Sequence, residues 1–205
     1  MKKIFLAFLF SAFATSALAD SHTNSEAQKI SFGFEGGYAT AETKDSARTL
    51  AQSLANSTGR TVTYTYEEAT YAGRIFGLYK ISDNLDLELG YMNTSSMDAN
   101  YSFSGTSVTA SVGLKANGFD YGIRYNTSPE LYFKLGMHSY DLDATASVTI
   151  SGTRYSATAT SSETNPYYGI GYNFNETWSV GYTMYTKVGG TNGGDVGFLY
   201  AGYRF

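Results

Sequence analysis

Apolar and polar residues alternate along the chain from residue 29 onward. In the stretch KISFGFEGGYA, Ile30, Phe34 and Tyr38 fall on one face of an extended chain and Glu35 falls on the other. A period of two is typical of β-strands with one apolar and one polar face. Seven further stretches alternate in the same way, at residues 71–81, 84–92, 118–126, 130–138, 167–174, 178–187 and 196–205. The pattern predicts about eight strands, each with an apolar band near the 9–11 residues that a tilted strand needs to cross a bilayer.

The stretch at residues 71–81 fits the pattern less cleanly than the others. Ile75 falls on its apolar face and Arg74 on its polar face, but Phe76 and Leu78 also fall on the polar face. We predict a strand of the same kind there, with two bulky apolar side chains among charged ones.

Short and long connections alternate between the predicted strands. Tight turns of turn-forming residues stand at 82–84, 127–129 and 175–177, and the other connections are longer, polar and rich in Ser, Thr and Gly. Short turns at one end and long loops at the other are typical of outer-membrane barrels, whose turns are periplasmic and whose loops are extracellular. A soluble β-sandwich is the alternative for each strand taken singly. Aromatic residues at the ends of the apolar faces and charges on the opposite faces favour the membrane barrel.

The composition agrees with long strands that carry aromatic rings. The 205 residues include 19 Tyr, 13 Phe and 22 Gly but only 2 Pro, and strands favour aromatic residues and exclude proline. No apolar run after residue 19 approaches the length of a transmembrane helix. An open sheet would leave backbone groups unsatisfied in lipid. The fold class that we predict is therefore all-β, an eight-stranded antiparallel up-and-down transmembrane β-barrel.

The first 19 residues have the organisation of a secretory signal peptide. Lys2 and Lys3 precede an apolar stretch that is too short to span a bilayer, and Ala17 and Ala19 form an A-x-A site. We predict export through the Sec pathway with cleavage after Ala19, and an uncleaved N-terminal anchor is the alternative. The predicted division is a signal peptide at 1–19, a short periplasmic segment at 20–28 and a barrel at 29–205.

Charge and cysteine content exclude several classes of function. The chain has 14 Lys and Arg against 18 Asp and Glu, and cleavage would leave 12 against 18. A mildly acidic chain without a basic run argues against nucleic acid as a partner. The chain has no cysteine, so it can form no disulfide, no thiolate metal site and no cysteine nucleophile. No cluster of His, Asp and Glu indicates a metal, and we expect no cofactor.

The alternating segments, the phrase LYKISDNLDLELGYM and the terminal YAGYRF resemble the small eight-stranded outer-membrane barrels of the OmpA and OmpX type from Gram-negative bacteria. The resemblance covers about Lys29 to Phe205. It implies an architecture and not a function, because this fold hosts adhesins, structural proteins, enzymes and small pores. It also implies outer-membrane lipid, lipopolysaccharide and the barrel-assembly machinery as partners. The positions that resemble the signal read by that machinery are Leu199, Ala201, Tyr203 and Phe205.

Charged residues on the polar faces would point into the barrel. In the predicted register these are Glu35, Arg74, Lys80, Asp86, Glu88, Asp120, Arg124, Glu130, Lys134, Lys187 and Arg204. An eight-stranded barrel is only wide enough for side chains to fill it, and an unpaired buried charge costs several kcal/mol. We therefore predict a lumenal ion-pair network that acts as a structural plug. A narrow gated conduit is the alternative, although no ring of one charge suggests a selectivity filter.

The first long loop contains a helical pattern. In DSARTLAQSLANSTG, Asp45 or Ser46 is a possible N-cap, Leu50 and Leu54 stand at helical spacing, and Gly59 follows the end. We predict a short helix that lies over the barrel mouth or on the membrane surface.

Alternation continues into the next two long loops. NYSFSGTSVTASV and TASVTISGTRYSATAT each read as two strand extensions around a Ser-Gly turn, at 104–105 and at 151–152. The two hairpins are neighbours in the barrel order. They either form a protruding sheet whose exposed edge can pair with another chain, or they simply cover the rim.

His138 is the candidate for catalysis, because some small barrels act on lipid A. A deacylase-like site needs a serine within reach of its histidine. Ser139 is adjacent, but neighbours on a strand point to opposite faces, and the residue two positions on is Tyr140. The His-x-Ser-Asn pattern of outer-membrane deacylases is absent. We expect a lumenal histidine that is hydrogen-bonded to Tyr or Asp.

The leading functional prediction is a non-enzymatic outer-membrane barrel. It would support envelope structure and present its extracellular loops for adhesion to a host-surface or matrix ligand. A lipid A-modifying enzyme and a narrow low-conductance pore are the alternatives.

Overall fold

The computed structural model describes residues 29–191 and 193–205, and these form ten strands and one helix. The predicted signal peptide at 1–19 and the predicted periplasmic segment at 20–28 lie outside the described residues. In chain order the elements are β1 (Ile30–Ala41), α2 (Lys44–Thr58), β2 (Val62–Tyr66), β3 (Ala69–Ser82), β4 (Leu85–Thr94), β5 (Met97–Phe103), β6 (Thr109–Asn126), β7 (Leu131–Ile150), β8 (Thr153–Asn173), β9 (Trp178–Val188) and β10 (Gly194–Arg204).

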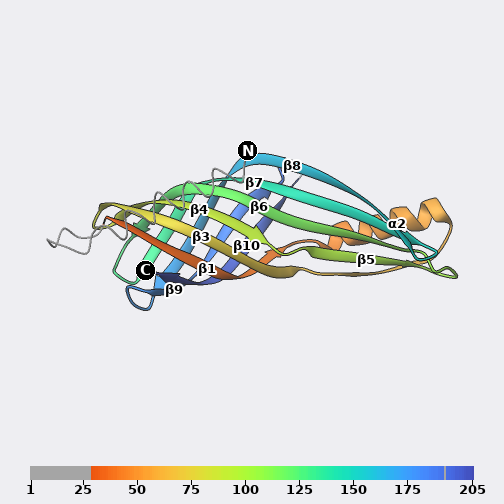
Figure 1. The fold of residues 1–205 in the computed structure, drawn as a ribbon, viewed down its shortest axis with the longest axis horizontal. Coiled ribbons are helices and arrows are strands. Elements are labelled where there is room, and N and C mark those ends of the chain that lie inside the picture. The colour runs from red at the N-terminus through yellow and green to blue at the C-terminus, as the bar shows by residue number, and fades with distance from the viewer. Residues whose placement is uncertain (1–28, 192) are drawn as a thin grey trace.

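Eight of the described strands close into a ring (Figure 1). Each pairs antiparallel with the next in the order β1, β3, β4, β6, β7, β8, β9 and β10, and β10 pairs with β1. The closing pair sets Phe34 opposite Tyr203, and the amide of Phe205 donates to the carbonyl of Phe32 at 2.9 Å. Closure gives the ring strands a partner on both sides and removes the sheet edges. The predicted eight-stranded antiparallel barrel is confirmed.

Large apolar side chains cover the outside of the ring. Those that lie on outward faces and are more than a third exposed are Ile30, Phe34, Tyr38, Tyr71, Ile75, Tyr79, Ile81, Leu87, Leu89, Phe119, Tyr121, Ile123, Tyr125, Phe133, Leu135, Tyr168, Ile170, Tyr172, Phe174, Trp178, Val180, Tyr182, Leu199 and Phe205. Aromatic pairs mark both ends of this belt, with Tyr38 and Tyr71 5.0 Å apart at the long-loop end and Trp178 and Tyr203 4.9 Å apart at the short-turn end. An apolar belt between aromatic girdles is the surface of a barrel in lipid.

Phe76 and Leu78 point into the barrel, as the alternation of β3 predicts. They are only 6% and 3% exposed. A Cβ at Gly33 on β1 would collide with the Phe76 ring, so this glycine leaves the space that the ring fills. The two apolar side chains therefore complete the lumenal packing beside the charged residues.

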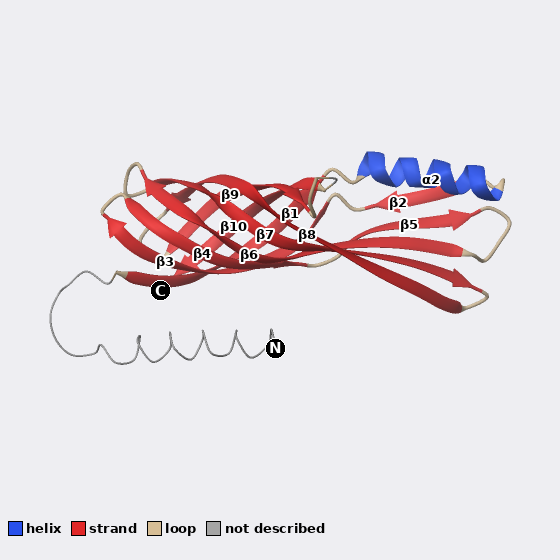
Figure 2. Cartoon of the chain, turned by 90° about the horizontal axis from the view of Figure 1, so that it is seen from above, coloured by secondary structure: helices blue, strands red, loops and turns tan. Residues whose placement is uncertain are grey.

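Beyond the ring the sheet continues as a protruding sheet, as Figure 2 shows. It consists of β2, β5 and the adjoining parts of β6 (residues 109–117), β7 (139–150) and β8 (153–164), paired in that order. The β7–β8 turn has φ of 50° at Ser151 and 83° at Gly152, the left-handed conformation of a two-residue hairpin. The two predicted hairpins thus extend away from the rim instead of covering it.

The helix predicted in the first long loop is present as α2. It begins two or three residues earlier than expected, because the N-cap residue is Thr43 and not Asp45 or Ser46, and Thr43 makes no side-chain cap. Gly59 ends the helix at φ 65°, with its amide donating to the carbonyl of Ala55. The Thr43 hydroxyl donates to the carbonyl of Glu67 at 2.6 Å, which fixes the start of the helix beside β2. Figure 2 shows α2 lying along β2 beyond the ring. No helix in the described part of the chain is long and apolar enough to cross a membrane.

Candidate functional site

Arg74 gathers three carboxylates in the middle of the barrel. Its Nη1 donates to Glu35 at 2.9 Å, its Nη2 to Glu88 at 2.5 Å, and its Nε to Asp120 at 3.0 Å. The four residues come from the neighbouring strands β3, β1, β4 and β6, and none is more than 3% exposed. A guanidinium has donors in a fixed fork and can serve several carboxylates at once.

Lys134 on β7 supplies a second cation to the same cluster. Its Nζ lies 2.6 Å from Glu35 Oε1 and 3.2 Å from Glu88 Oε1. The hydroxyl of Tyr140 donates to Asp120 at 2.7 Å. Three carboxylates thus face two cations and a tyrosine hydroxyl, which together stabilise charges that would be costly if buried alone.

A second polar cluster lies nearer the short-turn end. Arg124 donates to the side chain of Asn173 at 2.7 Å, and its guanidinium lies 3.5 Å above the ring of Tyr132. Asn126 donates to Asp86 at 3.0 Å. Arg124 and Asp86 are both buried, but they do not pair with each other. Each is hydrogen-bonded to the side-chain amide of an asparagine.

Three residues of the predicted network lie at the short-turn end, away from these clusters. Lys80 pairs with Asp83 in the β3–β4 turn at 2.9 Å, and this hydrogen bond lowers the pKa of the Asp83 carboxyl. Glu130 is exposed in the β6–β7 turn. Arg204 is half-buried and donates to the carbonyl of Glu176 at 2.9 Å. The lumenal alternation breaks down here because the strands end and the turns offer partners closer than the lumen does.

Lys187 is the fourth residue of the predicted network that lies outside both clusters. It is exposed at the long-loop end of β9. Strict alternation would point it inward, but its φ is 49° and the β9–β10 register shifts by one residue between Gly194 and Val196. A β-bulge of this kind redirects a side chain. The bulge therefore turns Lys187 away from the lumen.

An aromatic layer separates the ion pairs from the long-loop end. Tyr185 lies 5.0 Å from Tyr140 and 5.4 Å from Tyr167 between ring centres, and Phe198 lies 5.2 Å from Tyr200. All five rings are at most 2% exposed. The lumen at this height is filled by side chains, which fits a plug.

His138 is sealed within this layer. Its ring is 0% exposed, its Nε2 donates to the carbonyl of Thr186 at 2.7 Å, and it packs 4.7 Å from the ring of Tyr140. Its hydrogen-bond partner is therefore a backbone carbonyl and not the Tyr or Asp that we expected. Ser139 is exposed on the opposite face of β7, so the two residues do not form a nucleophile–base pair. Across residues 29–191 and 193–205, no three His, Asp or Glu side chains are grouped so that they could hold a metal ion.

The protruding sheet ends on one side at β2, along which α2 lies, and on the other side at β8, which forms its free edge. Its neighbour β9 pairs with it only from Tyr167 onward, so among the described strands residues 153–166 pair with β7 alone. The residues that flank a two-residue turn, here Ile150 and Thr153, form a hydrogen-bonded pair, and such pairs alternate along the ladder. The backbone N–H and C=O groups that point away from β7 therefore belong to Arg154, Ser156, Thr158, Thr160, Ser162 and Thr164.

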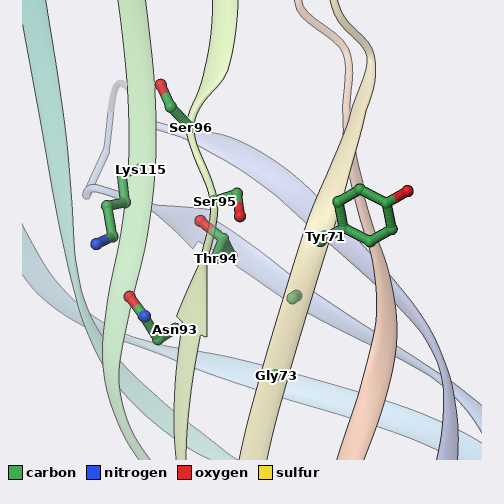
Figure 3. A pocket seen from close by; sticks show the side chains of 8 residues that line it. Tyr71, Gly73, Asn93, Thr94, Ser95, Ser96 and Lys115 are labelled. Carbon is green, nitrogen blue, oxygen red and sulfur yellow. The ribbon is translucent and has the colours of Figure 1, made fainter.

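A polar notch interrupts the outer wall where the apolar belt ends. It has a volume of about 360 Å³ and lies between β3, β4 and β6 (Figure 3). Tyr71 stands on one side of it, 67% exposed, and Asn93, Ser95 and Lys115 stand on the other. The change from aromatic to polar side chains marks the upper limit of the belt on this side of the ring.

The network predicted from the sequence lacks the uncharged members of both clusters. Tyr140, Asn126 and Asn173 occupy inward positions of their strands, but the predicted network included only charged residues. The alternation of β7 was the signal that could have found Tyr140, because it lies two residues after His138. The amides could have been found in the same way on β6 and β8.

Solved structures with the same fold include small barrels of bacterial surfaces. Ail, the attachment invasion locus protein of Yersinia pestis, is 14% identical, with a TM-score of 0.51 over 87% of this chain and 100% of Ail. Its structure in complex with the heparin analogue sucrose octasulfate is 13% identical, with a TM-score of 0.52 over the same shares. Neisserial surface protein A is 18% identical, with a TM-score of 0.38 over 86% of this chain and 96% of that protein. At these identities the likeness to the two Ail structures shows the fold alone. No curated protein matches the chain.

The family is shown by a match along almost the whole sequence. The model of the outer membrane protein beta-barrel domain matches residues 5–205, which include every strand of the ring. This match agrees with the closed ring, the apolar belt and the aromatic girdles. The chain therefore belongs to the outer membrane protein beta-barrel domain family and is a protein of the bacterial outer membrane.

Proposed function

We propose that this protein is a non-enzymatic outer-membrane barrel that supports the envelope and adheres to a host-surface or matrix protein through its protruding sheet. The observation that carries the proposal is the row of unpaired backbone groups on the free edge of β8. An exposed edge is a template on which an extended segment of another chain adds as a strand. The buried ion-pair network holds the barrel rigid beneath it.

The charges of the extracellular part favour a polypeptide over a sulfated polysaccharide as the ligand. A heparin analogue is bound in one of the Ail structures, and such polyanions need a basic surface. In this chain the segments beyond the ring carry nine acidic residues, Glu42, Asp45, Glu67, Glu68, Asp98, Asp141, Asp143, Glu163 and Asp195, against six basic ones, Lys44, Arg48, Arg60, Lys115, Arg154 and Lys187. Net negative charge repels a polyanion, whereas strand addition depends on backbone groups.

A proline on the free edge tests this proposal. The amide of Ser156 points away from β7, so Ser156→Pro removes an edge donor without breaking a β7–β8 bond, and edge positions tolerate proline. Ser156→Ala is the matched control, because it keeps the amide. Cells that display the Ser156→Pro variant should bind host cells or immobilised matrix proteins at least about tenfold less than wild type, and Ser156→Ala should bind like wild type.

A second variant distinguishes the contribution of the β8 edge to adhesion from that of the whole protruding sheet. Deletion of residues 145–160 together with 100–109 should leave a barrel with heat-modifiable gel mobility and abolish adhesion. Adhesion of Ser156→Pro at the wild-type level would refute strand addition, and adhesion of the double deletion at that level would refute adhesion through the protruding sheet.

The proposal includes the absence of enzymatic activity on lipid A. It is supported by the position of His138, whose Nε2 is occupied by a backbone carbonyl and whose neighbour Ser139 faces the other way. Mass spectra of lipid A from cells that overexpress the protein should match those from cells that carry the empty vector. A new lipid A species that disappears in His138→Ala would show an enzyme instead.

The proposal also includes a closed lumen. Its support is the burial of Arg74, Lys134 and their carboxylate partners beneath the aromatic layer. Planar-bilayer recordings of the purified protein should show no channel events. Reproducible conductance steps would favour the narrow pore.

A further inference from the structure

A cavity of about 1120 Å³ lies at the extracellular mouth, between the protruding sheet, α2 and the upper ends of β1, β9 and β10. We call it the mouth hollow. Its volume is slightly above the range of about 300–1,000 Å³ of sites for small organic ligands, so such a ligand fits in it. No residue of the free β8 edge lines it, so the inference drawn from it is independent of the proposed adhesion.

The walls of the mouth hollow are apolar. The inner face of the protruding sheet contributes Met97, Ala99, Val112, Leu114 and Leu142, and α2 contributes Ala47 and Leu50. These side chains line one face because strand pairing sets Met97 opposite Leu114 and Ala99 opposite Val112. Apolar walls of this extent favour a ligand with an apolar part.

The floor of the mouth hollow is closed. Met97, Ala116, Val188 and Val196 line it and also belong to the buried cluster that contains Phe198 and the lumenal tyrosines. Each of these four residues is at most 7% exposed. The aromatic layer thus separates the mouth hollow from the ion-pair network, and a ligand there would be held at the mouth.

The rim of the mouth hollow is acidic. Its lining includes five carboxylates, Glu42, Glu67, Glu68, Asp98 and Asp195, and no lysine or arginine. In the part of the chain that the structure describes, none of the five forms an ion pair. The amides of Asp98 and Lys187 donate to Glu67 and Asp195, which orients these two carboxylates without neutralising them. Five carboxylates without an ion-pair partner around one opening attract a cation.

We propose that the mouth hollow binds a cationic amphiphile, a small molecule with an ammonium or guanidinium head and an aliphatic tail. The tail lies along Met97, Leu114 and Leu142, and the head lies at the rim among the carboxylates. The apolar walls select the tail, and the charge of the rim selects a positive head over a neutral or negative one.

Binding of three probes with the same tail tests the assignment. The full chain is placed in nanodiscs of zwitterionic phospholipid, and the binding of decyltrimethylammonium, decanol and decanoate is measured by equilibrium dialysis against empty nanodiscs. Decyltrimethylammonium should bind saturably at one site, at least about tenfold more tightly than decanoate, and more weakly as salt screens the rim. Equal binding of decanoate and decyltrimethylammonium, or no binding above empty nanodiscs, would overturn the proposal.

Charge variants test whether the head of the ligand binds at the rim. Glu42→Gln combined with Glu68→Gln should weaken decyltrimethylammonium binding about tenfold and leave decanol binding unchanged. Glu163→Gln removes an acid that does not line the cavity and should change the binding of neither probe. A Glu163→Gln loss as large as that of the double variant would mean a general surface-charge effect and would overturn the rim assignment.

Filling variants test the walls. Ala99→Phe on β5 and Leu50→Trp on α2 each add volume to the cavity from a different element, and each should weaken decyltrimethylammonium binding at least about tenfold. Two elements are used so that one variant remains informative if the other fails to show heat-modifiable gel mobility. If a folded variant with a filled cavity bound decyltrimethylammonium as tightly as wild type, the ligand would bind elsewhere and the mouth hollow would be refuted as the site.

Discussion

Arg74 is the residue on which the buried charges of the barrel converge. It contacts carboxylates from β1, β4 and β6 while it is itself only 2% exposed. A buried ion cluster is not a strong source of stability when it is complete, but the loss of one partner leaves an uncompensated buried charge. The contribution of Arg74 is therefore best measured by its removal.

We expect Arg74→Met to destabilise the barrel by about 3–5 kcal/mol, because Lys134 pairs only with Glu35 and Glu88, and Asp120 would be left buried without a cation. Urea unfolding of the protein in lipid vesicles, followed by gel mobility, measures this loss. Lys80→Ala is the control, because Lys80 pairs with Asp83 at an exposed turn, where an ion pair has little effect on stability. Equal unfolding midpoints for Arg74→Met and wild type would show that the cluster reorganises without cost.

Each ring strand has two faces with different packing requirements, and glycine marks the difference. The inner face is crowded: a Cβ at Gly90 on β4 would meet the guanidinium of Arg74. The outer face is open: a Cβ at Gly73 on β3 would meet nothing within 4 Å. Glycine thus makes room for the ion-pair network on one strand and lies on the open outer face, beside the polar notch, on the next.

Gly90→Ala should therefore destabilise the barrel by about 1–3 kcal/mol, since the added methyl group displaces the Arg74 head from its carboxylates. Gly73→Ala is the matched substitution on the neighbouring strand and should not destabilise it. The same unfolding assay compares the two variants. A loss in Gly73→Ala equal to that in Gly90→Ala would point to backbone effects of glycine instead of crowding in the lumen.

At the scale of the whole molecule, the barrel depends on the pairing of its first and last strands. Leu199, Ala201 and Tyr203 lie on the outward face of β10 and Phe205 follows its end, and Tyr203 stacks on Phe34 of β1 with 5.6 Å between ring centres. The role of these four residues as an assembly signal stays a prediction.

Deletion of Phe205 tests that role. Phe205 is 70% exposed, pairs through its backbone with Phe32, and has its ring centre 6.2 Å from that of Tyr203, so its loss removes only a small part of the packing. We expect the amount of folded barrel in the outer membrane to fall severalfold, while the protein refolded from urea into detergent keeps nearly wild-type stability. Wild-type amounts of the deletion variant in the outer membrane would refute the assembly role.

The sequence by itself determined the features that depend on local pattern. A period of two gave eight ring strands and the inward positions of Glu35, Arg74, Glu88, Asp120 and Lys134, because a strand can turn its side chains only to alternate faces. Turn residues located the short connections, and helical spacing located α2 to within three residues. Local steric rules act on neighbouring residues, so these features could be predicted before any folding.

Only the tertiary structure decided which residues meet and what space they leave. Pairing of β3 and β6 with β4 brings Arg74 to Asp120, 46 positions away, and a bulge in β9 turns Lys187 out of the lumen. The mouth hollow exists because α2, the protruding sheet and the upper ends of β1, β9 and β10 enclose it together. No local pattern encodes such contacts, because they depend on the register and height at which distant strands pair.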